Sequence, residues 1–369
     1  MKPLTRIIYL DYLRSFIILI VVAFHSSLSF MSKAPAWWYV KSDTTSILFT
    51  IFVIITDVFM MPILFLISGY VLSIQLKNIS GPALLINRIK KLGIPWIICV
   101  FLFSPFLSLL MAKSLGNNLS YSEIITHYFW TDYYSQGPYW FLGLLLTFSA
   151  IIIFLNQFES IKIRFKQIPY IVIWLMIFIF PLIGYSTGSF IFGVDNWVNP
   201  LFIWSFQPSR ILTYLSYFLA GYILSERGYN KSNGIAVWGI GTLLLVGTFT
   251  ILKGAFEGTA LFSQLFMLGL IYAGIAISMS ALLHSVFFKY CNKRIKLFSF
   301  FSDHSFMIYL FHLPIQVLVA GWIINLPISI YGRWAVLFIS VVALSIGVSY
   351  SIILVRLIRK KVIPVTITR

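Results

Sequence analysis

Residues 11–25 read Asp11-Tyr12-Leu13-Arg14, then the apolar run SFIILIVVAF, and then His25. This stretch lies within a segment long and apolar enough to cross a bilayer as a helix. On a helix Arg14 and His25 are three turns plus about 20° apart, and roughly 16 Å apart along the axis. Asp11 falls on the same side, three residues before Arg14. Because a bare charge in lipid costs roughly 3 kcal/mol or more, this polar stripe predicts a site facing protein or water.

The composition extends this prediction to the whole chain. The sequence is 60% hydrophobic and 10% charged, with a mean hydropathy of +0.93, which is typical of an integral membrane protein. Apolar runs of spanning length predict an all-α, polytopic helical bundle that forms one membrane domain over 1–369, with no appended soluble domain. The ten predicted membrane helices cover residues 7–31, 48–75, 93–113, 138–157, 168–187, 208–225, 234–252, 262–287, 302–323 and 334–357.

The distribution of basic residues predicts the orientation. A net charge of +17 is often a sign of nucleic-acid binding. Here, however, twenty of the lysines and arginines fall at the N-terminal side of the ten-helix plan and only five in the opposite loops. This asymmetry predicts that both termini are cytoplasmic, in a multi-pass protein of the cell (inner) membrane. We therefore expect the lipid bilayer, and no nucleic acid, as a partner of the basic loops.

Four further stretches, in order along the chain, stand out beside the pair Arg14 and His25. They are Phe65-Leu66-Ile67-Ser68-Gly69-Tyr70, Arg88-Ile89-Lys90-Lys91 with Pro95-Trp96, Tyr139-Trp140-Phe141-Leu142 and Tyr309-Leu310-Phe311-His312. Together these five motifs are similar to those of the membrane-bound acyltransferase-3 family, which includes bacterial O-acetyltransferases and glucan succinyltransferases. Arg14 and His25 fit its R-x10-H signature. The basic cluster before the third long helix departs from the family's R-x-x-R form, because Lys91 stands in the last place.

The resemblance implies an O-acyltransferase that takes an acyl group, most simply acetyl, from cytoplasmic acyl-CoA (acetyl-CoA) to a hydroxyl of a cell-surface or periplasmic glycan. It suggests that Arg14, Arg88 and Lys91 bind the acyl-CoA, whose phosphates suit basic side chains. The residues also allow a simpler interpretation, in which Arg14 is a flanking cation paired with Asp11 and the basic loop reflects topology alone. We expect no metal and no tightly bound cofactor, since the two cysteines make no metal-binding spacing.

His25 is the best-placed candidate for the base that deprotonates the acceptor hydroxyl. Asp57 has a similar predicted depth in the second segment, so we predict that it orients the His25 imidazole, with Arg14 positioning the donor. A transient acyl-histidine is an alternative mechanism. The structural alternatives are that His25 only bridges two helices, and that Asp57 is a partner for Arg210 or a tyrosine hydroxyl.

His312, Tyr309 and Trp140 are the predicted substrate-binding residues. His312 lies near the middle of the ninth segment, and Pro314 beside it predicts a kink next to a cavity. Trp140 follows an outer joint rich in aromatic and amide side chains, which suits a sugar. Helix packing and an interfacial aromatic belt are the alternatives.

A transporter or flippase for a glycan or glycolipid is the alternative function. Such a protein would also use ionisable residues at membrane depth and helices broken by proline. Many transporters carry internal repeats, and the sequence shows none. The pattern therefore favours the acyltransferase.

Overall fold

The fold is all-helical in the computed structural model, which describes residues 7–228, 234–256 and 261–362. Within these ranges there are no β-strands, only two isolated β-bridges. The long helices are α1 (Ile8–Leu28), α2 (Ile47–Leu76), α4 (Ile94–Ser114), α6 (Trp140–Leu155), α8 (Tyr170–Phe192), α9 (Pro208–Glu226), α10 (Ile235–Ala255), α11 (Phe262–Tyr290), α12 (Lys296–Ile323) and α13 (Ile330–Val362). The short elements are α3 (Gly81–Arg88), η1 (Ile89–Gly93), α5 (Tyr121–Glu123), η2 (Ile124–Tyr128), η3 (Gly137–Tyr139), α7 (Glu159–Gln167) and η4 (Pro200–Phe202).

Each of the ten predicted segments corresponds to one long helix. Nine of the described helical spans are long and apolar enough to cross a membrane, which makes the chain a multi-pass membrane protein. The tenth helix, α9, is more polar, and it packs between α2 and α8. A polar helix can lie at membrane depth in this position, because its neighbours shield it from lipid.

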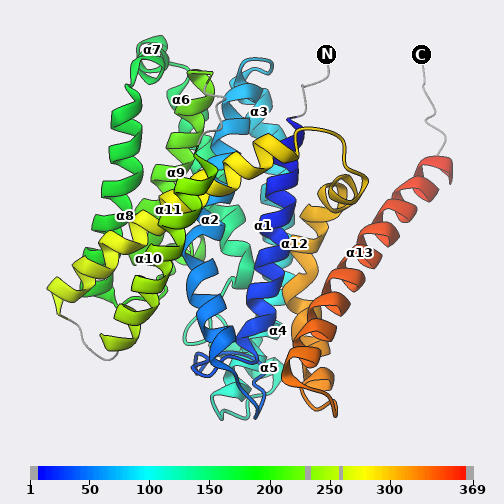
Figure 1. Ribbon diagram of the computed structural model, residues 1–369. Coiled ribbons are helices and arrows are strands. Elements are labelled where there is room, and N and C mark those ends of the chain that lie inside the picture. Colours follow the sequence, from blue (N-terminus) through cyan, green and yellow to red (C-terminus); the bar gives the residue numbers. More distant parts are fainter. Residues whose placement is uncertain (1–6, 229–233, 257–260, 363–369) are drawn as a thin grey trace.

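Figure 1 shows α1, α2 and α12 near the centre of the bundle, with α8 and α13 on opposite flanks. In the spanning part of α2, 61% of residues are buried, against 22% in α13 and 11% in α10, so the last two helices face mainly lipid. The start of α1 and the end of α13 lie at the same end of the molecule (Figure 1). We call the end of the molecule that holds the start of α1 and the end of α13 the basic end. The predicted cytoplasmic termini themselves, residues 1–6 and 363–369, lie outside the described residues.

Two glycines bring α2 and α9 into backbone contact. A Cβ atom added to Gly69 would lie 2.0 Å from the Phe218 carbonyl oxygen, and one added to Gly221 would lie 1.9 Å from the Leu66 carbonyl oxygen. Neither position has room for a side chain. Gly69 of the Ser68-Gly69-Tyr70 motif therefore has a packing role, as small residues commonly do between membrane helices.

The kink predicted at Pro314 is linked to the start of α6. Proline has no N–H, so it leaves the carbonyl four residues earlier, that of Leu310, without its helical donor. The Tyr139 hydroxyl donates to this oxygen at 3.0 Å. The Tyr309 hydroxyl in turn donates to the Pro138 carbonyl. These two bonds fix η3 against the middle of α12.

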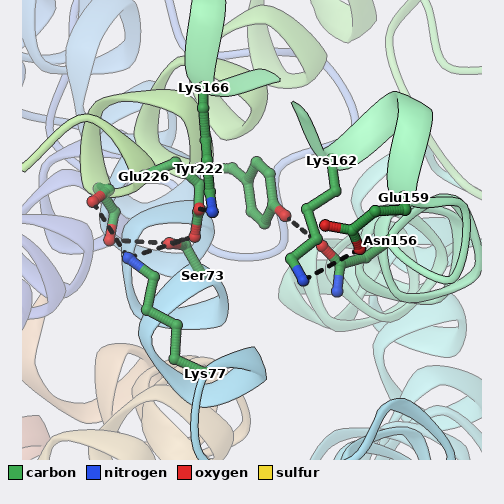
Figure 2. Close-up of polar contacts among 9 residues, drawn as sticks. Ser73, Lys77, Asn156, Glu159, Lys162, Lys166, Tyr222 and Glu226 are labelled. Atoms are coloured by element: carbon green, nitrogen blue, oxygen red, sulfur yellow. Dashed lines mark hydrogen bonds and ion pairs between the residues drawn. The ribbon is translucent and has the colours of Figure 1, made fainter. Parts of the chain in front are cut away.

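A buried carboxylate joins three helices at the basic end. Glu226, at the end of α9, has a side chain only 5% exposed and accepts a 2.7 Å hydrogen bond from the Ser73 hydroxyl. Lys77 Nζ on α2 lies 3.3 Å from its Oε1 atom, and Lys166 Nζ on α7 lies 4.0 Å from its Oε2 atom (Figure 2). Lys77 and Lys166 belong to the twenty basic residues that predict the orientation of the chain. They thus also compensate the buried charge of Glu226.

Candidate active site

Two histidine rings from distant parts of the sequence meet between α1 and α12. The ring centroids of His25 and His312 are 5.0 Å apart. Each helix supplies a nearby carbonyl: His25 Nδ1 lies 2.9 Å from Val21 O, and His312 Nδ1 lies 2.6 Å from Tyr309 O. Because a carbonyl oxygen only accepts, each Nδ1 atom carries the hydrogen and each Nε2 atom keeps its lone pair. His312 is 0% exposed and its Nε2 atom has no hydrogen-bond partner within the described residues, whereas His25 is partly exposed.

The loop between α1 and α2, residues 29–46, contributes an aromatic ring to this pair. Trp38 is 2% exposed, and its ring lies 6.0 Å from that of His25 with planes 20° apart. Its Nε1 atom donates to Ser29 Oγ at 3.1 Å. The sequence did not single out Trp38, because its position beside His25 depends on how this loop folds back onto α1.

Gln316 is a second residue that the sequence reasoning missed. It lies four residues after His312 on α12, hence on the same helical face. Gln316 is 1% exposed, and neither its Oε1 nor its Nε2 atom has a hydrogen-bond partner in the described structure. A glutamine four residues from a histidine, in the largely apolar second half of this helix, was the available signal.

Asp57 does not pair with His25, so this part of the sequence prediction is wrong. Its Oδ2 atom lies 2.5 Å from Arg210 Nη1, and Arg210 Nη2 also bonds Asp195 Oδ1 at 2.9 Å. The physical reason is that α9 packs against α2 and brings in the Arg210 side chain, which is 6% exposed. A buried guanidinium is costly without a carboxylate, and Asp57 supplies one at the same depth. This is the alternative partner that the sequence allowed.

Arg14 lies near the basic end of α1 and is not in contact with His25. Its Nη2 atom is 3.2 Å from Asp11 Oδ1, and its side chain is 41% exposed. The alternative pairing with Asp11 is therefore present. It leaves Arg14 exposed enough to meet a ligand.

Arg88 and Lys91 have different surroundings although they are three residues apart. The helix widens to a π-turn, η1, directly after Arg88, and Lys91 is exposed there. Arg88 is 9% exposed and donates to Ser149 Oγ at 2.9 Å and to Gln75 Oε1 at 3.0 Å. Both partners are neutral, and no ion pair of Arg88 occurs among the described residues. A buried, uncompensated cation of this kind is suited to binding an anion.

The other two predicted substrate-binding residues face different neighbours. The Tyr309 ring lies 5.9 Å from His312, while its hydroxyl is bound to the Pro138 carbonyl. Trp140 lies against Tyr214 of α9 at 5.2 Å and Trp197 at 5.5 Å. Thus Tyr309 belongs to the histidine site, whereas Trp140 packs toward α9.

Residues 7–354 match the family model Acyl_transf_3, which is described as an acyltransferase domain. The chain belongs to the acyltransferase-3 family. Neither the comparison with curated proteins nor that with solved structures returned a match. Nearly the whole described bundle is thus a membrane acyltransferase domain, and the paired histidines lie inside it.

The positions of the His, Cys, Asp and Glu side chains show whether they could bind a metal ion. Within residues 7–228, 234–256 and 261–362, no group of three or more His, Cys, Asp or Glu side chains could hold a metal ion. The side chains in contact at the site are two imidazoles and aromatic rings, and the Gln316 amide lies one helical turn from His312. They can accept a proton or offer a hydrogen bond to a reacting acyl group.

Proposed function

We propose that the protein is an O-acyltransferase that moves an acyl group, in the first instance acetyl, from acyl-CoA to a hydroxyl of a glycan. The observation that carries this proposal is the contact between the His25 and His312 rings, in which each Nδ1 atom faces a backbone carbonyl oxygen and each Nε2 atom keeps its lone pair. The twenty-to-five distribution of basic residues supports donor entry from the cytoplasm at the basic end and acceptor entry from the other side, across the inner membrane.

In this mechanism His25 Nε2 takes the proton of the acceptor hydroxyl as the hydroxyl oxygen attacks the thioester carbonyl. A carbon–oxygen bond forms and the carbon–sulfur bond breaks. The imidazolium then returns the proton to the departing CoA thiolate, so that the histidine is regenerated. His312 contacts His25 closely enough to hold the acceptor or share the proton transfer.

The test is to incubate membranes containing the protein with labelled acetyl-CoA and to follow the label into the glycan fraction. We expect His25→Gln and His25→Ala to lower the rate at least about 100-fold, as for loss of a general base. His127→Ala, at an exposed histidine, is the matched control and should keep the wild-type rate. If wild-type membranes transfer no label while glycan export depends on the protein, the proposal fails in favour of a transporter.

Arg88 gives a separate test of acyl-CoA as the donor. Its buried guanidinium has only neutral partners, so we propose that it binds a phosphate of acyl-CoA, with Lys91 and Arg14 at the more exposed entrance. Arg88→Gln should raise the KM for acetyl-CoA at least tenfold, since a hydrogen bond to a charged group contributes about 1.5–3 kcal/mol. Lys293→Gln, an exposed charge change at the basic end, is the control. An unchanged KM in Arg88→Gln would rule out this contact.

A further inference from the structure

The histidine pair lacks a visible hydrogen-bond donor for the reaction proposed above. Both Nδ1 hydrogens are directed to backbone carbonyls, of Val21 and Tyr309, so both rings offer only acceptors at Nε2. Acyl transfer through a tetrahedral intermediate develops negative charge on the carbonyl oxygen. Preorganised donors for that oxygen usually make the largest single contribution to catalysis.

The polar side chains that touch the two rings do not fill this role. The Trp38 indole N–H donates to Ser29 Oγ, and the Tyr309 hydroxyl donates to the Pro138 carbonyl. Each of these two hydrogens therefore already has an acceptor within the protein. A donor for the acyl oxygen would therefore come from a third side chain near the two rings.

The Gln316 amide meets this requirement. It lies one helical turn from His312, on the same face of α12, and it is 1% exposed. Among the described residues both amide atoms lack a partner, as does His312 Nε2. Buried polar side chains are almost always hydrogen-bonded, so an unsatisfied amide one helical turn from an unsatisfied imidazole calls for a functional explanation.

We propose that Gln316 is a catalytic residue whose Nε2–H donates to the oxygen of the acyl group as negative charge develops on it. The proposal rests on the proposed acyl transfer and adds a role for this chain's own amide. The oxygen of the bound acyl group is then the acceptor for this N–H. The cost of burying the free amide is then a stability penalty retained for catalysis.

This explanation predicts opposite effects on activity and stability. Gln316→Met keeps the length and approximate volume of the side chain but removes the N–H donor and the unsatisfied polar atoms. We expect kcat for labelled acetyl transfer to fall about 100- to 1,000-fold, as for loss of one oxyanion donor. The KM for acetyl-CoA should stay within about twofold, because an interaction made only in the transition state does not contribute to ground-state binding. The Tm of the purified protein should stay equal or rise, because an unsatisfied amide is no longer buried.

A purely structural amide would behave differently. If Gln316 had only a structural role, Gln316→Met would lower Tm and the amount of active protein together, without a selective loss of kcat. Gln157→Met, at an exposed glutamine beyond the end of α6, controls for the substitution itself and should change neither quantity. A kcat for Gln316→Met within about threefold of wild type, or a fall in Tm that accounts for the lost activity, overturns the inference. If the wild-type protein transfers no acetyl group, the proposed function fails first, and that outcome is recognised before any variant is compared.

Discussion

The crossing of α2 and α9 is so close that one added methyl group should weaken the bundle. In Gly221→Ala the new Cβ atom would lie 1.9 Å from the Leu66 carbonyl oxygen, whereas real Cβ contacts essentially never fall below 3.0 Å. The carbonyl would have to retreat by at least 1.1 Å, the difference between these distances. It belongs to the backbone of α2, so the helices themselves must separate. Overpacking of this kind costs about 3 kcal/mol, the upper part of the usual range.

The measurement is Tm of the purified protein in detergent, followed by size-exclusion after heating. For a chain of 369 residues with an unfolding entropy of about 2.1 cal/mol/K per residue, a loss of about 3 kcal/mol corresponds to a Tm lower by roughly 4 °C. Gly247→Ala on α10 is the matched control, because a Cβ there meets nothing within 4 Å and alanine favours a helix. Its Tm should equal or exceed that of the wild type. If Gly221→Ala and Gly247→Ala have the same Tm, the close crossing does not hold the two helices together.

Two further substitutions test other polar contacts of the bundle. Tyr139→Phe removes the donor to the Leu310 carbonyl, four residues before Pro314, and we expect a destabilisation of about 1–3 kcal/mol, measured as a lower Tm. Asp57→Asn should lower Tm more than Asp195→Asn, because the Asp57 side chain is 25% exposed and the Asp195 side chain 67% exposed. For Asp195→Asn the loss should be about 1 kcal/mol or less, as for exposed ion pairs. Equal losses in the two asparagine variants would contradict the larger role assigned to Asp57.

The positions of the helices were predictable because the signal is local. A run of apolar residues has to be long enough to cross the bilayer, and each of the ten predicted segments has its helix in the structure. Even α9, with its polar side chains and Arg210, was predicted from its length and composition. His25 was also identifiable, because an ionisable group in an apolar run is costly wherever the helix packs.

The partners of the buried polar groups were not predictable in the same way. Equal depth suggested that Asp57 supports His25, but depth does not give the rotation of a helix about its axis. Packing of α9 on α2 turns Asp57 to Arg210, and packing of α12 on α1 brings His312 to His25. Two side chains at one depth can face opposite sides of the bundle.

The sequence by itself determined the class of the protein and the order of its membrane helices, and it singled out His25 as a candidate, because hydropathy and helical spacing are properties of neighbouring residues. The tertiary structure decided that His312 rather than Asp57 meets His25. Among the described residues it also left the Gln316 amide without a hydrogen-bond partner and gave Arg88 only neutral partners. The physical reason is that these contacts depend on which faces of distant helices meet. Close backbone contacts such as that at Gly221 fix those faces, and they form only when the bundle is assembled.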